Sequence, residues 1–382
     1  MDFDLPEEIQ QIRATTRDFA RAEMAPVIGG YLEREEFPTD LIRKIAALGV
    51  LGLPYPEEHG GSAAGLLAFA VALEELSRVS PSIGAIVFAH SSPATLIHLN
   101  GSPAQKREWL EPLARGEMLG AIGITEPSGG SDVANLRTRA TRTADGWRLD
   151  GSKAFITNTG TDLTGVVVAA AATEEGDPRR RLSSFIVPAG ASGMRTGRPL
   201  RKIGWRLATT CELFFDDCHL APNALLGVRG DGARQMLTAV TYGRVCVGAI
   251  ALGLAQACFD AAAAYARERE AFGQRIAAFQ GVAFPLADLG VRIEATRLLT
   301  YQAAWLADSA RPFRMQASMA KLFGSELAVD AARAAIQILG SPAISREHPI
   351  SWLLDEAKVL EIVEGTSEVQ RLVLARLLGV TA

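Results

Sequence analysis

The sequence predicts a mainly helical fold with an inserted β domain. The order is an N-terminal helical domain, a middle antiparallel β domain and a C-terminal four-helix bundle. The spacing of hydrophobic residues changes twice along the chain, from a helical period to a strand period and back. Alanine, the best helix former, is abundant, whereas aromatic residues make up only 7% of the chain. Because strands and helices are segregated rather than alternating, a Rossmann arrangement is not predicted.

The first stretch, residues 1–120, is expected to be a helical domain. Ile9 and Ile12 recur at helical spacing, and Pro6 precedes them at a position where the first helical turn tolerates proline. A second amphipathic pattern stops at Gly49, which is expected to end that helix.

The second stretch, residues 121–231, is expected to be a mostly antiparallel β domain. Its dipeptides Asp145-Gly146 and Asp150-Gly151 are expected to form tight turns, because both central positions of a type I′ turn need a positive φ. The strand-like apolar runs are 165–168, 184–187 and 213–215.

The third stretch, residues 232–382, returns to a helical pattern. Because the connections between its segments are short, neighbouring helices are expected to pack antiparallel as a bundle. The expected helices are 236–268, 276–308, 315–339, 351–363 and 368–378.

Charge and cysteine content exclude several classes of protein. The 39 basic and 43 acidic residues give a net charge of −4, so a nucleic-acid binder is not expected. The arginine-rich loop 174–181 is expected to be a solvated tip. Four irregularly spaced cysteines and five scattered histidines predict neither a disulfide scaffold nor a metal site.

Location is predicted from the chain start and the apolar runs. The acidic N-terminus lacks the pattern of a signal or transit peptide. The apolar stretch 245–259 is shorter than the roughly 20 residues of a spanning helix. We therefore expect a cytoplasmic protein with no membrane span.

A polar, glycine-rich segment, residues 123–132, directly follows an apolar run. Thr125 and Ser131 add hydroxyl groups to a loop whose backbone N–H groups are exposed by Gly129 and Gly130. Such a loop suits the carbonyl or phosphate groups of a ligand. A purely structural turn explains the same residues equally well.

A second polar segment, residues 362–371, is expected to be a junction between two helices. Gly365 would end one helix, and Ser367 with Gln370 has the spacing of a capping box for the next. Neither explains Glu364, because a carboxylate at a helix C-terminus is disfavoured by the helix dipole. Its apolar neighbours should raise its pKa, which suits a general base acting on a carbon acid.

Together these segments resemble the acyl-CoA dehydrogenase family, and the resemblance runs through nearly the whole chain. The order of five motifs is that of the family. These motifs are the loop 122–132, Phe155-Ile156-Thr157, Glu268 to Gly273 followed by Gln280, Gln337 to Gly340, and Glu364 to Arg371.

The resemblance implies FAD-dependent α,β-dehydrogenation of an acyl thioester, carried on CoA or on an acyl carrier protein. Glu364 would remove the α proton while the flavin N5 accepts the β hydride, which gives the trans-2-enoyl thioester. Some family members carry the base on a bundle helix at the position of Gly243, and glycine cannot serve. Glu364 is therefore the expected catalytic residue.

The resemblance also implies the residues of the two binding sites. Those expected to contact FAD are Ile122, Ile124, Thr125, Gly130, Ser131, Phe155, Ile156, Thr157, Arg269, Phe272, Phe279, Gln280, Gln337, Ile338, Gly340, Thr366 and Glu368. Those expected to contact the substrate are Ser131, Tyr242, Arg244 and Gly365.

The expected partners are electron-transfer flavoprotein or another acceptor, and further copies of the chain in a dimer or tetramer. Two alternatives stay open. One is an acyl-CoA oxidase or flavin monooxygenase on the same fold, and the other is a non-catalytic relative. The chain departs from the family pattern at Phe155, where tryptophan is usual, at Ser341 to Ala343, where glycines are usual, and at Asp355-Glu356, where Arg-Asp is usual.

Overall fold

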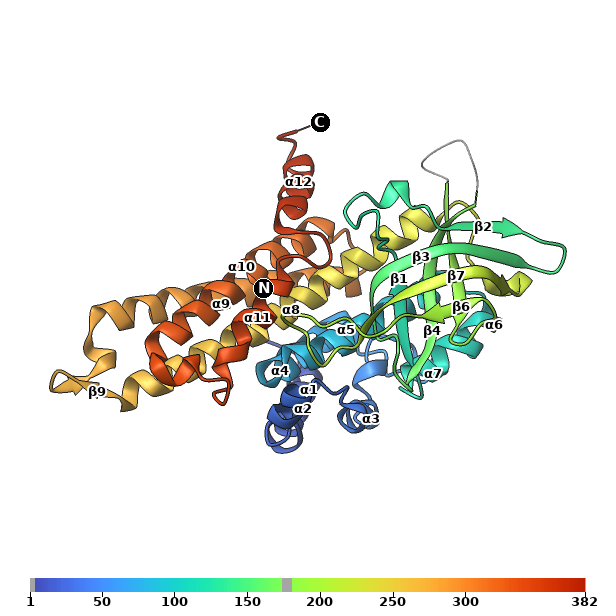
Figure 1. Cartoon of the computed structure of the whole chain (residues 1–382). Coiled ribbons are helices and arrows are strands. Elements are labelled where there is room, and N and C mark those ends of the chain that lie inside the picture. Colours follow the sequence, from blue (N-terminus) through green and yellow to red (C-terminus); the bar gives the residue numbers. More distant parts are fainter. Residues whose placement is uncertain (1–3, 174–180, 382) are drawn as a thin grey trace.

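The computed structural model describes residues 4–173 and 181–381. A helical unit and a helical bundle flank a β domain, as the hydrophobic pattern predicts (Figure 1). All but the last residue of the arginine-rich loop 174–181 lies outside the described residues. The predicted domain limits stay predictions. Strand β1 begins at Leu119, two residues before the predicted start of the β domain at 121, and helix α8 begins at Gly232.

The N-terminal unit is helical throughout. Pro6 precedes α1, and Gly49, at a φ of +76°, directly follows the C-cap residue of α3. The sequence therefore located the beginning of one helix and the end of another. The helices are α1 (Glu7–Phe19), α2 (Ile28–Arg34), α3 (Thr39–Ala47), α4 (Gly65–Val79), α5 (Pro81–Asn100), α6 (Pro103–Gln105) and α7 (Glu111–Ala114).

The middle unit is one eight-stranded sheet in the order β6-β7-β3-β2-β4-β5-β8, with β1 beside β4. Among the described residues most neighbouring strands are antiparallel, and only the β1–β4 and β2–β4 pairs are parallel. The strands are β1 (Leu119–Gly123), β2 (Arg139–Arg142), β3 (Trp147–Thr157), β4 (Thr164–Ala172), β5 (Leu182–Pro188), β6 (Met194–Thr196), β7 (Thr210–Leu220) and β8 (Leu225–Leu226).

One of the two predicted tight turns is wrong. Asp145-Gly146 does lie in the turn between β2 and β3, but only the glycine has a positive φ, so the turn is not of type I′. Asp150-Gly151 lies inside β3, where the register with β7 shifts. Gly151 has a φ of +141°, and a Cβ there would lie 2.7 Å from the Cα of Thr138. The glycine therefore permits a β-bulge and a close approach to the neighbouring segment.

The C-terminal unit is a bundle of long helices from which the last helix projects (Figure 1). Three predicted limits differ from the structure by more than one residue. Helix α8 begins at Gly232 rather than at 236. Helix α9 begins at Gln280 because a short hairpin and a 3-10 turn follow α8. Helix α11 ends at Leu360 because the chain then enters a turn with left-handed residues. The elements are α8 (Gly232–Glu268), β9 (Glu270–Ala271), β10 (Gln274–Arg275), α9 (Gln280–Asp308), α10 (Arg314–Leu339), α11 (Ile350–Leu360) and α12 (Ser367–Leu377).

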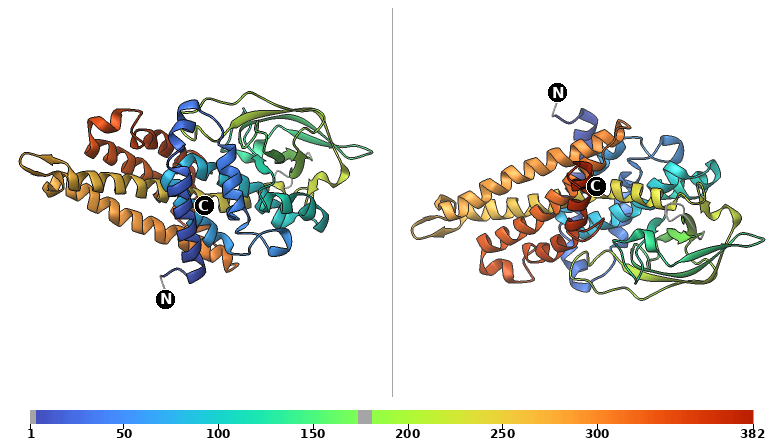
Figure 2. Two further views of the ribbon diagram at one scale, coloured as in Figure 1. Left: turned by 90° about the horizontal axis from the view of Figure 1, so that it is seen from below. Right: turned by 90° about the horizontal axis from the view of Figure 1, so that it is seen from above.

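Helix α8 connects the three units. Its 37 residues run from the sheet to the β9–β10 hairpin at the far end of the bundle, and the N-terminal helices cross the middle of the molecule (Figure 2). Helices α5 and α8 are long and apolar enough to cross a membrane by length and composition alone. Their most apolar windows are 89% and 72% buried within the protein, as in core helices of a folded domain.

Candidate active site

Glu364 lies in the turn between α11 and α12 and has an unusual backbone conformation. Its φ is +55°, and Gly365 follows at +88°. A left-handed conformation costs a residue other than glycine about 1–3 kcal/mol, so surrounding contacts must stabilise it. We call residues 361–366 the base turn.

The Glu364 side chain is directed at Gly243 of α8. A Cβ at Gly243 would lie 2.6 Å from Oε2 of Glu364 and 3.0 Å from Cε2 of Phe88 on α5. No larger residue fits without displacing the carboxylate. Glycine at this position thus provides the space that the Glu364 carboxylate occupies.

Three side chains from three different helices hold the backbone of the base turn. Arg244 Nε donates to the Glu364 carbonyl at 3.3 Å, and Gln370 Nε2 donates to the carbonyls of Glu364 and Gly365, both at 2.9 Å. Lys321 Nζ donates to the carbonyls of Glu361 at 3.2 Å and Gly365 at 2.8 Å. Arg244, Lys321 and Gln370 are all buried. These contacts fix the direction of the Glu364 side chain.

Burial raises the pKa of Glu364 to about 7, as its apolar neighbours predict. The cations of Arg244 and Lys321 act in the opposite direction and keep the pKa from rising further. A carboxyl group with a pKa near 7 can accept a proton and release it again near neutral pH.

The predicted capping box at the start of α12 is wrong. The N-cap is Thr366, whose hydroxyl accepts from the Val369 N–H at 3.3 Å, and Ser367 is the first helical residue. The Gln370 amide donates to the base turn instead. Spacing alone could not separate these roles, because neighbouring Thr366 and Ser367 are both good caps.

The glycine-rich loop 123–132 is anchored by a buried ion pair. Lys153 Nζ contacts Oε1 of Glu126 at 2.8 Å, and neither side chain is exposed beyond 3%. Backbone N–H groups of Arg137 and Thr138 donate to the same carboxylate. Burial alone would raise the pKa of Glu126, but these hydrogen bonds outweigh burial and lower it to about 2. The loop is therefore fixed through Glu126.

Several predicted cofactor residues gather around this loop. Gly130 lies against Thr125, since a Cβ there would lie 3.3 Å from Cγ2 of Thr125. Ser131 is exposed beside Gly130. Ile122 on β1 and Ile124 just after it are partly buried against the core.

A bulge in β3 turns Phe155 outward. The register with β7 shifts between Lys153 and Ile156, and Phe155 has a φ of +59° and is 66% exposed. Thr157 is partly exposed, while the Ile156 side chain is buried in the sheet core. Because its side chain is buried, Ile156 could contact a ligand only through its backbone. This part of β3 therefore presents an exposed apolar ring, that of Phe155, and a partly exposed hydroxyl residue, Thr157.

A third group of predicted residues lies at the far end of the bundle. Phe272 and Gly273, both at positive φ, form the two-residue turn of the β9–β10 hairpin, where Phe272 is 96% exposed (Figure 1). The Phe272 ring packs edge-on against that of Phe279, with 6.1 Å between the ring centroids. Helix α8 separates this hairpin from the sheet, so one chain does not bring it to loop 123–132. The group also holds Arg269 and Gln280 at the ends of α8 and α9, and Gln337, Ile338 and Gly340 at the end of α10.

The remaining predicted residues lie near the base turn. Tyr242 precedes Gly243 on α8 and packs edge-on against Phe313. Thr366 and Glu368 are at the start of α12, where Glu368 is exposed. Sequence reasoning missed Phe88, Lys153 and Lys321. The one sequence signal for the two lysines is that each is a charged residue at an otherwise apolar strand or helix position.

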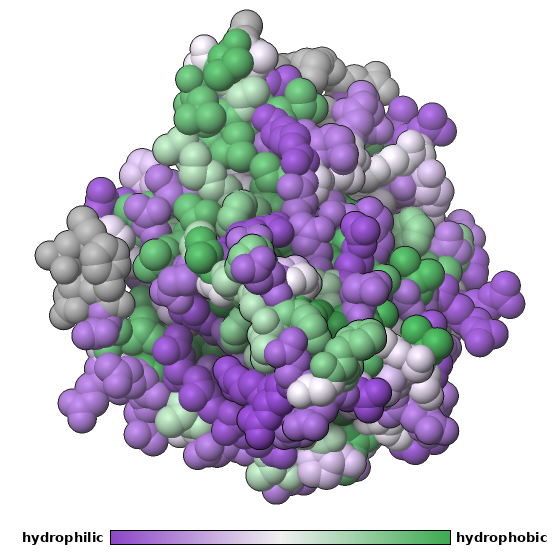
Figure 3. Space-filling model, turned by 90° about the vertical axis from the view of Figure 1, so that its left-hand side faces the viewer, coloured by the Kyte–Doolittle hydropathy of each residue, from purple (hydrophilic) through white to green (hydrophobic). Residues whose placement is uncertain are grey.

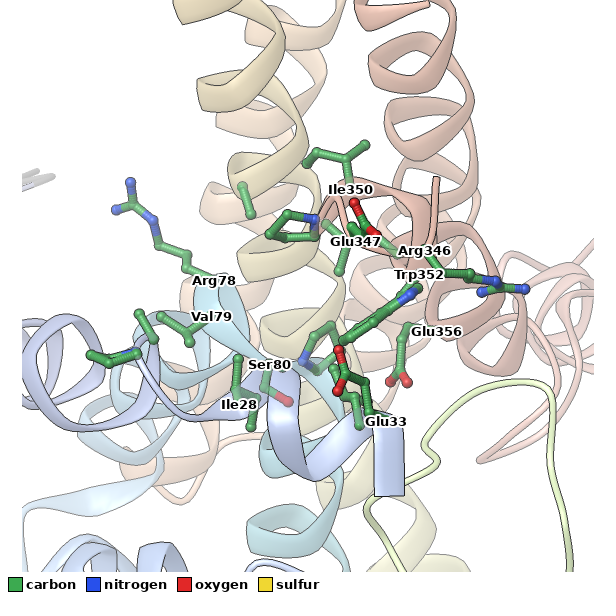
Figure 4. A pocket seen from close by; sticks show the side chains of 18 residues that line it. Ile28, Glu33, Arg78, Val79, Ser80, Arg346, Glu347, Ile350, Trp352 and Glu356 are labelled. Atoms are coloured by element: carbon green, nitrogen blue, oxygen red, sulfur yellow. The ribbon is translucent and has the colours of Figure 1, made fainter. Parts of the chain in front are cut away.

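A cavity lies apart from the Glu364 turn. It measures about 370 Å³ and is enclosed by α2, the α4–α5 junction and α11, with Trp352 and Glu356 among its lining residues (Figure 4). Ser82 donates to Glu356 at 2.9 Å, and burial raises the pKa of Glu356 to about 7. Glu364 does not line this cavity. Among residues 4–173 and 181–381, no cluster of His, Cys, Asp or Glu could hold a metal ion.

Comparison with known protein families agrees with the motifs. Profiles of the acyl-CoA dehydrogenase N-terminal, middle and C-terminal domains match residues 6–117, 121–218 and 230–379. The chain belongs to the acyl-CoA dehydrogenase family. It is therefore a flavin oxidoreductase of the type that acts on the CH–CH group of acyl-CoA.

Similar sequences span essentially the whole chain. The chain is 40% identical to a probable acyl-CoA dehydrogenase, YngJ, of Bacillus subtilis, covering 98% of this chain and 99% of that protein. It is 37% identical to a short-chain specific acyl-CoA dehydrogenase of Clostridium acetobutylicum, with 98% and 99% covered.

Solved structures agree over the same length. Butyryl-CoA dehydrogenase of Megasphaera elsdenii superposes with a TM-score of 0.96 at 34% identity, covering 99% of this chain and all of that one. A chain in a structure described as the electron transferring flavoprotein of Acidaminococcus fermentans gives 0.97 at 37% identity, with 99% of both chains covered.

Members of this family depend on FAD. A glutaryl-CoA dehydrogenase of Mycobacterium smegmatis, solved with FADH2, superposes with a TM-score of 0.93 at 29% identity over 99% of this chain and 96% of that one. The residues present fit such a cofactor. Phe155 offers an exposed aromatic face, and the backbone N–H of the preceding Ala154 donates to the Thr125 carbonyl at 2.9 Å, which joins loop 123–132 to this part of β3.

Proposed function

We propose that the enzyme dehydrogenates a short acyl thioester to the trans-2-enoyl thioester, with Glu364 as the base. The observation that carries this proposal is the position of Glu364, a carboxylate of raised pKa held in a left-handed turn against Gly243. FAD, when bound, supplies the acceptor for the hydride that leaves Cβ.

Glu364 would take the α proton, and its own backbone N–H would donate to the thioester carbonyl as negative charge develops there. Gly365 lets the substrate approach the backbone closely, because it has no side chain. Arg244 donates a hydrogen bond to the Glu364 carbonyl and thereby helps to hold the turn that carries the base. Phe155, Thr125, Ser131 and Thr157 would hold the flavin.

A short acyl group is supported by the surroundings of Glu364. The Phe88 ring lies directly beside Gly243 and the carboxylate, and it packs edge-on against Trp205 at 6.5 Å. A long acyl tail passing the base would have to displace this buried pair. Short-chain relatives and a butyryl-CoA dehydrogenase are among the similar proteins.

We propose a homo-oligomer, dimer or tetramer, in which the far end of one bundle completes the FAD site of another copy. The hairpin residues are too far from loop 123–132 of their own chain. Seen from the hairpin end, hydrophobic residues cover the projecting top of the molecule, formed by α12 (Figure 3). Exposed apolar residues also repeat every seven positions along α9, at Phe284, Val291, Leu298 and Trp305.

We further propose a cytoplasmic enzyme that passes its electrons to an electron-transfer flavoprotein and accepts a CoA or carrier-protein thioester. Its four cysteines are buried free thiols, which suits a reducing compartment. The structural similarity to a chain of an electron transferring flavoprotein structure supports this acceptor. A panel of CoA and carrier-protein thioesters, scored by anaerobic flavin bleaching, would identify the preferred carrier.

The decisive test is Glu364→Gln. The variant should retain FAD but lose flavin bleaching by the best thioester by at least about 10²-fold, since it cannot accept a proton. Glu361→Gln, a neighbouring carboxylate paired with Lys358, is the matched control and should bleach normally. Normal bleaching by Glu364→Gln would disprove the assignment. Rapid reoxidation of the reduced flavin by oxygen would favour the oxidase or monooxygenase alternative, and no bleaching by any thioester would favour a non-catalytic relative.

A further inference from the structure

Lys321 is a buried cation beneath the base turn. It lies in the middle of α10 with no exposed surface, and its Nζ donates to the carbonyls of Glu361 and Gly365. Among the ion pairs of the described residues, none involves Lys321 in direct contact. A buried ammonium without a contacting carboxylate is unfavourable, so this position needs an explanation.

A purely structural explanation covers only half of the contacts. Glu361 directly follows α11, and a cation near the C-terminus of a helix is favourable. That accounts for the bond to the Glu361 carbonyl. It does not account for the shorter bond to the Gly365 carbonyl, which lies beyond Glu364 and outside any helix.

The two bonds of Lys321 lie on either side of Glu364. One goes to the carbonyl of Glu361, three residues before Glu364, and the other to the carbonyl of Gly365, one residue after it, so Lys321 links the two sides of the base turn. Arg244 and Gln370 bind the carbonyl of Glu364 itself. With its carbonyls held on both sides, Glu364 is kept in the left-handed conformation that directs its carboxylate to Gly243.

We propose that Lys321 is a positioning residue that fixes the orientation of Glu364 and, through its charge, the pH range in which Glu364 acts as the base. This inference rests on the proposed function. It goes beyond that function by assigning a role to a residue outside the predicted catalytic, cofactor and substrate residues, whose hydrogen bonds go to the base turn.

The charges around the turn give the direction of the effect. Burial lowers the pKa of Lys321 to about 8, and the ammonium form in turn favours ionised Glu364. Removing this cation should therefore raise the pKa of Glu364. The other ionisable groups that act on the pair are Arg244 and Cys246 on α8, Glu361 after α11 and Glu368 on α12.

The experiment compares Lys321→Met, Lys321→Gln and Lys321→Arg in the FAD-loaded enzyme. Anaerobic bleaching is followed from pH 5 to 9 with butyryl-CoA or the best thioester found. Both neutral variants should move the acid limb of the profile upward by about one pH unit and slow bleaching about 10- to 100-fold at pH 7. Lys321→Arg should keep the position of the acid limb.

A second readout does not depend on activity. Hydrogen exchange of the peptide amides at 361–370 should be faster in both neutral variants than in the wild type. The matched control is Lys358→Met, which removes an exposed lysine paired with Glu361 from the same segment. It should change neither the exchange nor the pH profile. If Lys321→Met does not fold, Lys321→Gln, which keeps an amide donor, gives the same comparison.

The outcomes separate this inference from the proposed function. An unchanged pH profile in a neutral Lys321 variant would overturn the inference, and so would an effect equal to that of Lys358→Met. If no thioester bleaches the wild-type flavin but exchange at 361–370 responds to Lys321, the proposed reaction is wrong and the holding of the turn by Lys321 stands.

Discussion

Two fully buried lysines support two functional loops in opposite ways. Lys153 contacts the carboxylate of Glu126 directly at 2.8 Å and thereby anchors loop 123–132. Lys321 donates instead to two backbone carbonyls of the base turn, and its charge acts on the Glu364 carboxylate without direct contact. The pKa of Glu126 is about 2, whereas that of Glu364 is about 7.

The difference shows how one kind of residue serves two purposes. The Glu126 carboxylate, in direct contact with buried Lys153 and with two backbone N–H groups, stays ionised near neutral pH and serves as an anchor. The Glu364 carboxylate has no contacting cation among the described residues, because Lys321 donates to backbone carbonyls instead, so its pKa stays near 7 and it can accept a proton. Contact geometry rather than residue type therefore separates the anchor from the base.

The largest expected effect tests the anchor. Lys153→Met leaves the Glu126 carboxylate buried without its cation, which should lower the free energy of unfolding by about 3–5 kcal/mol and reduce the bound FAD. Chemical denaturation and flavin absorbance measure the two effects. Lys44→Met removes the exposed partner of Glu23 and should leave the unfolding midpoint unchanged. Equal losses in the two variants would mean that the buried pair does not anchor the loop.

A smaller effect separates the two carboxylates by pH. Glu126 has a folded-state pKa of about 2, below its ordinary 4.5, so the stability it contributes is present above pH 4.5 and is lost as the pH falls toward 2. Glu364 has a folded-state pKa of about 7, so its contribution is present below pH 4.5 and is lost as the pH rises through 7.

Denaturation midpoints measured between pH 3 and 9 would check both signs. Glu126→Gln should flatten the acid side of the stability profile, where about 2 kcal/mol is at stake. Glu364→Gln should flatten only the interval from about pH 4.5 to 7. The two assignments are wrong if Glu126→Gln changes stability between pH 4.5 and 7, or if Glu364→Gln changes it on the acid side.

A third expected effect concerns the space around the base. Gly243→Ala places a methyl group within 2.6 Å of Oε2 of Glu364, so the carboxylate must move. We expect a loss of stability of about 1–3 kcal/mol and at least tenfold slower bleaching. Gly248→Ala on the same helix is a suitable control, because its Cβ would meet Thr300 and Ala320 rather than Glu364. A fast Gly243→Ala enzyme would show that Glu364 does not act from this position.

Much of the site could be predicted from sequence because its parts are local. The loop 123–132, the run from Glu364 to Arg371 and the hairpin residues are continuous motifs. The turn at Asp150-Gly151 and the cap at Ser367 were predicted wrongly, because the same residues suit a turn or a bulge and either of two caps. The outward rotation of Phe155 depends on a register shift against β7, which no local pattern reveals.

The sequence by itself determined the order of helical and β units, the family and the identity of the base, because periodicity and motifs are properties of neighbouring residues. Only the tertiary structure decided that Gly243 makes room for Glu364 and that Lys321 and Lys153 are buried beneath two different loops. These contacts join residues more than 25 positions apart, and the pKa values they set depend on burial and distance. Those quantities exist only once the chain is folded.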